Sequence, residues 1–342
     1  MTGLSLPERR TEMKKPVVVC GLPESRFEKY GVTWPEDWDV RYVNRQYTSE
    51  NLADADYLLV DAMDDVTAEM MDWAPELKVI HSEGVSFNKI DIEAAKERGI
   101  CVCNNRAVNK VSVAEHTVML ALAGVKRVTV LDSLIKTQGY KAASDWFLAN
   151  GVCEIAGMTV GMIGMGAIGR EVLARFKGWD CNLCYYDPFR MPEEAEKANN
   201  LTYLELDELF AKSDIVTVHV PVVPSTVGIV GWDQIKAMKP GAVLVNVSRG
   251  SMVVEDALVW GLENGVVGCA ALDTVDPEPM PDDHPYRNLS PEAMERVIFT
   301  THSAGRTQQA FRRMLQWAVA DFQKAEAGEL PNNIVNGVNK LR

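Results

Sequence analysis

Three side chains able to bind a carboxylate and to move a proton occur in the second half of the chain, each soon after an apolar run. They are Arg249, Glu278 and His302. Each run has the length and composition of a buried strand. In a parallel sheet the carboxyl ends of the strands meet at one edge, and ligands bind there. We therefore expect the three side chains to share that edge. The runs are residues 242–246, 267–272 and 297–300.

These three residue types fit one reaction. A guanidinium grips a carboxylate with two parallel hydrogen bonds. A histidine takes a proton from an alcohol or returns one to a carbonyl, and a neighbouring glutamate favours the imidazolium and fixes its orientation. With a nicotinamide opposite, the set predicts hydride transfer between a 2-hydroxy acid and a 2-oxo acid. Each residue also has a structural alternative: Arg249 in a surface ion pair, Glu278 as a loop acid between prolines, and His302 as a hydrogen-bonded structural histidine.

A glycine-rich turn predicts the site for a dinucleotide. Gly164, Gly166 and Gly169 have G-x-G-x-x-G spacing between a predicted strand, 158–163, and a helix-like stretch. The first glycine permits a tight turn, and the second lets a pyrophosphate approach the backbone. The third lets the helix pack close to the strand.

The next predicted strand ends in an acid. Asp187 lies about twenty residues after Gly166, where a carboxylate accepts hydrogen bonds from an adenosine ribose. A carboxylate there repels a 2′-phosphate, so the sequence favours NAD over NADP. Arg190, three residues further on, could offset that repulsion.

Strands alternate with helices along most of the chain, which predicts parallel sheets in an α/β protein. The first part lacks a glycine-rich phosphate loop, whereas six strands from residue 158 onwards match a doubly wound nucleotide-binding fold. A polar stretch at 104–110 indicates the crossover between domains, and the helical stretch 307–327 is expected to return to the first domain. The other predicted strands are 15–21, 55–61, 77–81, 100–103, 182–186 and 215–220, and the long predicted helices are 111–128 and 130–140.

We therefore predict two doubly wound parallel-sheet domains with a cleft between them. Residues 1–110 and 306–342 would form a discontinuous, flavodoxin-like substrate-binding domain. Residues 111–305 would form a Rossmann NAD-binding domain.

Composition narrows the class of protein. The chain has 342 residues, enough for about two domains, and its net charge of -13 argues against binding nucleic acid or an anionic membrane. No apolar stretch approaches the roughly 18 residues of a membrane span, and the N-terminus lacks the apolar core of a signal peptide. Seven scattered cysteines indicate reduced thiols and a cytoplasmic protein.

One cysteine spacing has the form of a redox or zinc motif. Cys181 and Cys184 lie on a predicted strand, where positions three apart point to opposite faces, and no second pair completes a zinc site. We expect ordinary packing for both and no bound metal. Packing or solvation also accounts for the remaining histidines, which are His81, His116, His219 and His284.

Taken together, the motifs resemble those of the D-isomer-specific 2-hydroxyacid dehydrogenase family, which includes D-lactate, glyoxylate/hydroxypyruvate and D-3-phosphoglycerate dehydrogenases. The resemblance covers roughly residues 77–309, and the set is highly specific although no single motif is. The motifs are the glycine turn with Asp187, His219-Val220-Pro221 with Thr226, the segment from Met238 to Gly250, Leu272-Asp273 with Glu278, and Thr301 to Gly305.

The resemblance implies a role for each of several residues. Arg249 is expected to hold the substrate carboxylate, His302 to be the acid/base, and Glu278 to be its partner. The backbone N–H groups of Val85 and Ser86, in a substrate loop that begins at Gly84, are expected to help bind the carboxylate. The residues expected to line the dinucleotide are Gly164, Gly166, Ala167, Ile168, Gly169, Asp187, Val220, Pro221, Thr226, Val247 and Ser248, with Asp273 near the nicotinamide amide.

The resemblance also implies a homodimer joined through the cofactor domains, using residues 111–150. The sequence departs from the family pattern at Thr301, where many members have proline, and at Ser86, where glycine or threonine is more usual. Glu83 would repel a phosphorylated substrate. Phe87 and Trp146 are candidates for a substrate side-chain pocket, although Trp146 is equally suited to a core or an interface.

Two other functions are consistent with the same motifs. One is an NAD(H)-sensing interaction protein of the CtBP corepressor type, which retains the Arg–Glu–His set. The other is a formate- or phosphite-type dehydrogenase. The resemblance implies that a formate dehydrogenase of this family pairs its histidine with a glutamine. Glu278 in this chain therefore argues against formate oxidation.

Overall fold

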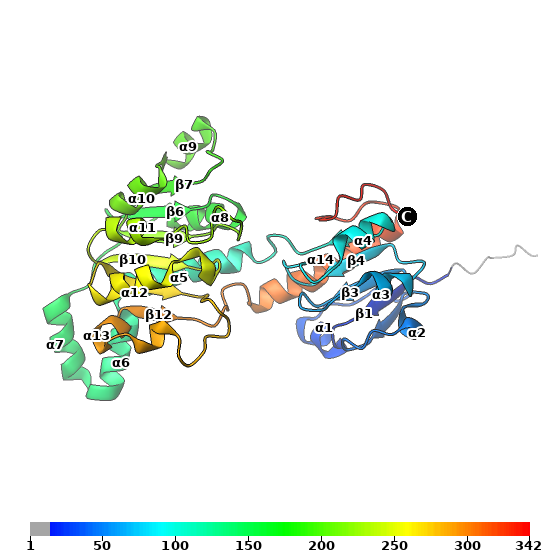
Figure 1. Ribbon diagram of the computed structural model, residues 1–342, viewed down its shortest axis with the longest axis horizontal. Helices are drawn as coiled ribbons and strands as arrows, with labels where there is room; N and C mark the ends of the chain where they lie inside the picture. Colours follow the sequence, from blue (N-terminus) through cyan, green and yellow to red (C-terminus); the bar gives the residue numbers. More distant parts are fainter. Residues whose placement is uncertain (1–13) are drawn as a thin grey trace, which may run out of the picture. The chain divides into compact units, whose positions relative to one another are not determined.

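A computed structural model describes residues 14–342, which form two compact units (Figure 1). Unit 1 contains the chain up to Val108 together with Gln308–Arg342, and unit 2 is Asn109–Thr307. The units therefore divide at 108/109 and 307/308, against 110/111 and 305/306 in the sequence-based expectation. Each unit has its own sheet and its own buried apolar core.

Unit 1 is built on a five-stranded parallel sheet with strand order β2-β1-β3-β4-β5, which is the flavodoxin-like order. Its central strands β1 and β3 are fully buried and consist mostly of valine and leucine, as expected for strands covered on both faces. The strand β2 was not predicted from the sequence. The strands are β1 (Val17–Cys20), β2 (Asp39–Tyr42), β3 (Tyr57–Val60), β4 (Val79–Ser82) and β5 (Cys101–Cys103).

Helices cover both faces of this sheet. The C-terminal helix α14 (Gln308–Glu326) packs its apolar stripe, including Leu315 and Phe322, against one face together with α1 (Glu24–Tyr30). The chain's last helix therefore completes the core of the unit that contains its first strand. The other helices of unit 1 are α2 (Ser49–Leu52), α3 (Ala68–Asp72) and α4 (Ile92–Glu97).

Unit 2 is built on a seven-stranded parallel sheet with strand order β12-β11-β10-β9-β6-β7-β8. This is the Rossmann order, in which the strand order reverses, here between β6 and β9; in folds of this order ligands bind outside the carboxyl ends of the strands at that point. The short strand β8 was not predicted, and β9 ends at Val218, two residues earlier than expected. The strands are β6 (Thr159–Ile163), β7 (Asn182–Tyr186), β8 (Leu201–Tyr203), β9 (Ile215–Val218), β10 (Ala242–Asn246), β11 (Val267–Leu272) and β12 (Val297–Phe299).

The helices of unit 2 pack on the two faces of this sheet. The long helix α5 (Lys110–Lys126) contacts α8 (Ala167–Phe176), and both belong to the same apolar cluster. The others on the sheet are α9 (Glu193–Asn199), α10 (Leu206–Lys212), α11 (Trp232–Ala237), α12 (Glu255–Glu263) and α13 (Pro291–Met294), with short 3-10 turns at Gly250–Met252 and Pro285–Asn288.

Two helices of unit 2 extend away from the sheet (Figure 1). They are α6 (Val128–Gln138), which corresponds to the helix predicted at 130–140, and α7 (Tyr140–Asn150), which was not predicted. The chain breaks between them at Gly139, whose φ of 90° favours glycine. The pair has a small apolar cluster of its own, formed by Val130, Leu134 and Ala143.

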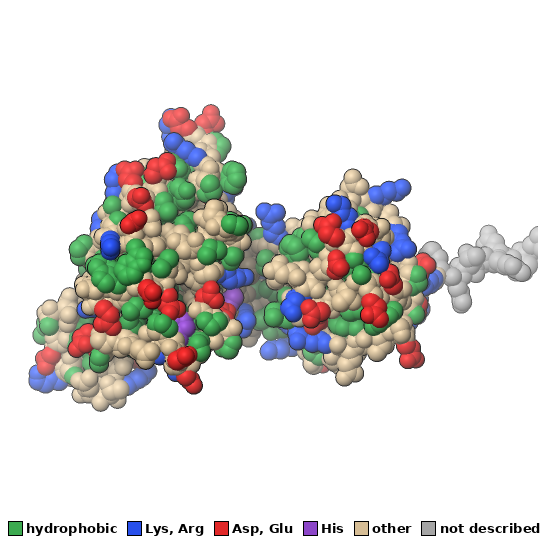
Figure 2. Space-filling model, viewed as in Figure 1, with side chains coloured by type: hydrophobic (Ala, Val, Ile, Leu, Met, Phe, Trp, Pro, Cys, Tyr) green, Lys and Arg blue, Asp and Glu red, His purple; other side chains and the backbone are tan. Residues whose placement is uncertain are grey.

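Within residues 14–342, no helix is both long enough and apolar enough to cross a membrane. On the face drawn in Figure 2, acidic and basic side chains are interspersed over both units. Neither unit shows a continuous basic surface on that face.

Candidate active site

The structure brings together the predicted acid/base and its predicted partner. His302 Nδ1 lies 2.7 Å from Glu278 Oε2, and the two side chains are 36% and 34% exposed. A carboxylate only accepts, so this contact assigns the hydrogen to Nδ1 and leaves Nε2 to exchange a proton with a ligand. The second Glu278 oxygen, Oε1, accepts a hydrogen bond of 3.3 Å from the backbone N–H of Val275.

Arg249 lies beside the segment that carries Glu278. The backbone of Gly250 packs so closely against Val275 that a Cβ atom at residue 250 would lie 2.1 Å from the Val275 carbonyl carbon. Glycine is therefore required next to Arg249, and it fixes the arginine at the carboxyl end of β10 against the loop after β11. The Arg249 side chain is exposed, and its Nη1 donates to the carbonyl oxygen of Ser248 at 2.7 Å.

Asp273 holds the loop that carries His302. It is 1% exposed, and its carboxylate accepts hydrogen bonds from the backbone N–H groups of Ser303 (2.9 Å) and Ala304 (3.0 Å) and from the Thr300 hydroxyl. Its carbonyl oxygen accepts from the N–H of His302 at 2.8 Å. These bonds support the positive φ of 51° at His302, a conformation that is costly for a residue with a side chain.

His116 joins this network, which the sequence did not indicate. Its Nε2 lies 3.1 Å from Thr300 Oγ1 and 3.5 Å from Asp273 Oδ1. Burial lowers the pKa of His116, with Asp273 opposing that effect. The sequence showed only that His116 is near the start of the long predicted helix, and the packing of that helix against β11 is seen in the structure alone.

The glycine turn has the shape that a pyrophosphate needs. Gly164 has a φ of 95°, and a Cβ atom at Gly169 would lie 2.1 Å from the Gly164 carbonyl oxygen. Nothing lies within 4 Å of the Cβ position at Gly166, so this residue faces open space at the start of α8. The first N–H groups of a helix have no partner within it and attract an anion. Ala167, Ile168 and Gly169 open that helix.

Asp187 is fixed at the end of β7. Its Oδ2 accepts from the backbone N–H of Met165 at 2.7 Å, and its Oδ1 accepts from that of Phe189 at 2.8 Å. Each carboxylate oxygen has a further lone pair, so the group remains able to accept hydrogen bonds from a ribose. The hydrogen bond from Met165 thereby joins Asp187 directly to the glycine turn.

The remaining residues predicted to line the dinucleotide follow β9 and β10. Thr226 Oγ1 donates to the Pro221 carbonyl oxygen at 2.6 Å and so closes the loop after Val220. After β10, Ser248 Oγ donates to Asn246 Oδ1 at 3.0 Å, and Val247 is buried. All these residues belong to unit 2 and lie at the carboxyl edge of its sheet.

In unit 1, the carbonyl oxygens of the predicted substrate loop accept hydrogen bonds from nearby side chains and backbone. Asn105 donates from Nδ2 to Glu83 O (2.6 Å) and from its backbone N–H to Gly84 O (2.9 Å). Asn104 Nδ2 donates to Val85 O at 2.6 Å, and Ser82 Oγ to Ser86 O at 2.6 Å.

By contrast, the N–H groups of this loop remain available. Those of Gly84, Val85 and Ser86 donate to no acceptor within residues 14–342. A run of free backbone N–H groups is a binding site for an anion such as a carboxylate. Neither Asn104 nor Asn105 was singled out from the sequence, although both directly follow a predicted strand.

Glu83 is not the free negative charge that the sequence analysis assumed. Its side chain is 5% exposed, and its Oε1 lies 2.8 Å from Arg26 Nη2. Arg26 also lies 3.7 Å from Asp61. Burial raises the pKa of Glu83 to about 7, with Arg26 opposing that effect. Glu83 therefore presents no uncompensated negative charge to a phosphorylated substrate, because burial raises its pKa and Arg26 lies beside it.

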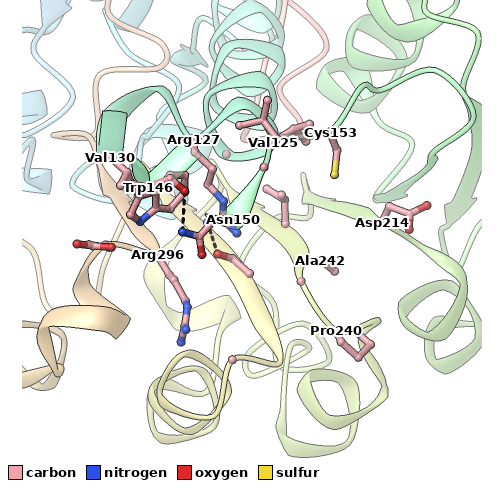
Figure 3. Close-up of a pocket in the computed structure, with 18 of the residues that line it drawn as sticks. Val125, Arg127, Val130, Trp146, Asn150, Cys153, Asp214, Pro240, Ala242 and Arg296 are labelled. Atoms are coloured by element: carbon pink, nitrogen blue, oxygen red, sulfur yellow. Dashed lines mark hydrogen bonds between the residues drawn. The ribbon is translucent and has the colours of Figure 1, made fainter. Parts of the chain in front are cut away.

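A cavity of about 580 Å³ in unit 2 lies at the opposite, amino-terminal edge of the sheet (Figure 3). It is lined by residues at the starts of β10 and β11 and by the α6–α7 pair, including Arg127, Trp146 and Ala242. Ligands bind at the carboxyl edge of such sheets, so we do not assign this cavity to the cofactor. Trp146 packs with the α6–α7 cluster, and Phe87 packs against the core of unit 1.

The cysteine pair and His219, for which the sequence predicted packing and no chemistry, lie in or beside the strands of unit 2. Cys184 is buried in β7, and Cys181 directly precedes that strand. His219 Nε2 lies 2.9 Å from Thr217 Oγ1, and burial lowers the pKa of His219 to about 3. Within the described residues, no group of three or more His, Cys, Asp or Glu side chains is arranged to hold a metal ion.

Comparison with known proteins agrees with this geometry. Residues 118–304 match the model of the NAD-binding domain of D-isomer-specific 2-hydroxyacid dehydrogenases. A glyoxylate reductase from Thermofilum pendens is 36% identical over 302 residues, which cover 88% of this chain and 86% of that protein. A D-3-phosphoglycerate dehydrogenase from Methanocaldococcus jannaschii is 36% identical over 85% of this chain, but only 53% of its own length is matched.

Solved structures give the same result. The D-lactate dehydrogenase from Aquifex aeolicus, in complex with NAD and lactic acid, aligns with a TM-score of 0.72 and 26% identity, covering 94% of this chain and 99% of that one. The chain therefore belongs to the D-isomer-specific 2-hydroxyacid dehydrogenase family. It is an oxidoreductase that uses NAD and acts on the CH–OH group of its donor.

Proposed function

We propose that the protein interconverts a D-2-hydroxy acid and its 2-oxo acid, and that it works as a 2-oxoacid reductase. The observation that carries this proposal is the 2.7 Å contact between His302 Nδ1 and Glu278 Oε2 at the carboxyl edge of the unit 2 sheet. That contact leaves Nε2 as the proton donor or acceptor. The position of Arg249, next to the same loop, supports its role in binding the substrate carboxylate.

The residues of this chain divide the work between binding and proton transfer. NAD, when bound, accepts or supplies the hydride. Arg249 binds the carboxylate through its planar fork and so orients the carbon to be reduced. His302 gives the proton on Nε2 to the carbonyl oxygen during reduction and takes it back during oxidation. Glu278 keeps the hydrogen on Nδ1 and stabilises the imidazolium.

We assign the remaining predicted residues to cofactor and substrate binding. The glycine turn and the start of α8 hold the pyrophosphate, and Asp187 holds the adenosine ribose. The open space beside Gly166 and the fixed carboxylate of Asp187 support this assignment. The free N–H groups of Gly84, Val85 and Ser86 support a second contact to the substrate carboxylate. Val220, Pro221, Thr226, Val247, Ser248 and Asp273 would line the dinucleotide.

The proposal is tested by NADH oxidation with a panel of 2-oxo acids. The panel holds glyoxylate, pyruvate, hydroxypyruvate, 2-oxoisocaproate, phenylpyruvate and phosphohydroxypyruvate. The names of the relatives support testing glyoxylate first. Turnover of at least one oxo acid, lost in His302→Ala, is expected. NADH binding with no turnover across the panel would contradict the proposal and support an NAD(H)-sensing protein of the corepressor type. Reduction of NAD by formate or phosphite would support a formate- or phosphite-type dehydrogenase.

We also propose that the protein is a cytoplasmic homodimer joined through unit 2. Helices α5–α7 carry large apolar side chains that are exposed in the single chain, including Tyr140 (79%) and Leu148 (78%). An apolar surface of this kind on a helical arm is typical of a subunit interface. Sedimentation of the native chain is expected to give a dimer, and Leu148→Glu is expected to shift it towards monomer. The cytoplasmic location rests on the seven free cysteines, five of which are buried.

A further inference from the structure

The loop after β7 contains an arginine whose guanidinium is already hydrogen-bonded to a carboxylate of the same unit. Arg190 donates from Nε to Glu196 Oε1 and from Nη2 to Glu196 Oε2, both at 2.9 Å. Its guanidinium carbon lies 4.9 Å from the centre of the Tyr203 ring. Two parallel bonds and a stacked aromatic ring hold this guanidinium in one orientation, although its side chain is 57% exposed.

Glu196 is itself held in place. Its side chain is 7% exposed, and its Oε1 also accepts a hydrogen bond of 2.7 Å from the Tyr185 hydroxyl. That hydroxyl accepts from the backbone N–H of Met191 at 2.7 Å. The Arg190 guanidinium lowers the pKa of Glu196 to about 2, so the carboxylate is charged at any physiological pH. The pair is therefore part of a built network that joins β7, the loop and α9.

Arg190 would be the natural ligand for a 2′-phosphate. It lies three residues after Asp187, the acid placed at the adenosine ribose. In dinucleotide-binding folds an acid at this place binds the ribose 2′-hydroxyl, whereas an arginine nearby accommodates the 2′-phosphate. This chain carries both residue types within one loop. Asp187 alone therefore does not account for a preference between the two cofactors.

We propose that Glu196 is a specificity-determining residue, which holds Arg190 away from the ribose and thereby keeps the site selective for NAD over NADP. The proposal rests on the proposed assignment of Asp187 to the adenosine ribose. Asp187 repels a 2′-phosphate, and Glu196 engages the arginine of the same loop that would offset the repulsion. The network thus contains a latent site for a 2′-phosphate.

The test compares two adenosine fragments on the full-length protein, by calorimetry or by displacement of NADH fluorescence. The fragments are 5′-AMP and 2′,5′-ADP, which differ by the 2′-phosphate. Glu196→Gln keeps the size of the side chain and a partner for Tyr185, but removes the charge that holds Arg190. We expect it to tighten 2′,5′-ADP binding by about tenfold relative to 5′-AMP, because a freed guanidinium forms charge-assisted bonds to phosphate. The ratio of NADPH to NADH turnover should rise with it.

Matched variants make the outcome specific. Glu193→Gln, on the same helix and paired with Lys197, should leave the fragment ratio unchanged. Arg190→Gln alone should also leave the fragment ratio unchanged, because in the native protein Glu196 already keeps the arginine from the 2′-position. The double variant Glu196→Gln/Arg190→Gln should return to the native ratio. If Glu196→Gln unfolds, Glu196→Asp takes its place, because the shorter side chain cannot keep both bonds to Arg190, and the same rise in relative 2′,5′-ADP binding is expected.

Two results would overturn the proposal. One is an unchanged fragment ratio in folded Glu196→Gln. The other is a native ratio that falls in Arg190→Gln, because the arginine would then already be reaching the 2′-position. Failure of the underlying site assignment is recognised separately. In that case Asp187→Ala would leave 5′-AMP binding unchanged.

Discussion

His302 Nδ1 lies 2.7 Å from Glu278 Oε2, although the two residues follow different strands and lie 24 positions apart in the chain. Two sets of hydrogen bonds between backbone N–H groups and carboxylates hold this contact in place. Asp273 holds the loop that carries His302, and the Val275 N–H holds Glu278. The imidazole is thus oriented by Glu278 and by the loop that carries it, and Nε2 takes no part in that contact.

Removing the partner of His302 should damage turnover more than binding. Glu278→Gln is expected to lower kcat by about 10²-fold and to change the KM for the oxo acid little, since the imidazolium is stabilised most while the proton moves. His302→Ala should lower kcat by at least as much. Steady-state kinetics with NADH measures both. Glu295→Gln, an exposed carboxylate elsewhere in unit 2, is the control. A loss of less than about tenfold in His302→Ala would contradict the acid/base role.

The pH dependence should have opposite signs in the two directions. Reduction needs protonated His302, so its rate should fall as pH rises. Oxidation needs the neutral ring, so its rate should rise with pH. Two other histidines of unit 2 are not expected to contribute, because burial lowers the pKa of His116 and lowers that of His219 to about 3. His116→Gln should therefore keep the shape of both profiles. If it abolished either slope, the titrating group would be His116.

The glycine turn allows cofactor binding to be separated from folding. Gly166→Ala adds a methyl group where nothing lies within 4 Å, so we expect the variant to fold normally. It should bind NADH at least about tenfold more weakly, because the methyl group occupies the space that a pyrophosphate needs. Fluorescence titration and thermal unfolding give the two readouts. Gly178→Ala, which also meets no atom within 4 Å, should change neither. Unchanged NADH affinity in Gly166→Ala would place the pyrophosphate elsewhere.

Asn105 should affect the substrate loop and not the cofactor. Its side chain and backbone hold the carbonyl oxygens of Glu83 and Gly84, and its Nδ2 also donates to Met314 O at 3.1 Å. Asn105→Ala is expected to raise the KM for the oxo acid by about tenfold, because the loop's N–H groups lose their fixed direction. NADH affinity should stay the same. Asn51→Ala, at an exposed helix cap in unit 1, is the control. An equal change in both constants would indicate a general loss of structure.

Much of this organisation was predictable because the signals are local. The strands β7, β10 and β11 match the predicted residue ranges, since each is a short buried run of the kind that parallel sheets require. Strand-end position also led to Arg249, Glu278 and His302 without a structure. By contrast, β2 and β8 are partly exposed, and their residues carry no continuous apolar pattern. The helix α7, which follows Gly139, was likewise not predicted.

The contacts that adjust the site were not predictable, because they depend on how separate elements pack against one another. Thr300 and His116 meet at Asp273 across 184 positions, and each has an ordinary local setting. The pairing of Arg190 with Glu196 depends on how α9 returns over β7, and α9 itself was not predicted. Long-range side-chain pairing follows from topology and register, which periodicity does not encode.

Glu83 should make the stability of the protein fall as pH rises through neutrality. Burial raises the pKa of this carboxyl from 4.5 to about 7 in the fold, so the folded state binds the proton more tightly than the unfolded state does. Between these two values the unfolded state holds fewer protons, and the free energy of unfolding therefore decreases with pH. The full shift corresponds to a loss of up to about 3 kcal/mol, complete above the folded pKa.

Glu83→Gln tests this sign, because glutamine keeps the shape of the side chain and cannot ionise. Chemical denaturation between about pH 5 and pH 8 should show a smaller fall in unfolding free energy for this variant than for the native chain. Glu69→Gln, an exposed carboxyl of the same unit, should leave the native slope unchanged. The Arg26 guanidinium at 2.8 Å opposes the effect of burial. If Arg26 instead dominates, the folded pKa will lie at or below the unfolded value, so the native chain and Glu83→Gln will show the same slope across this range and Glu83 will be charged in the fold.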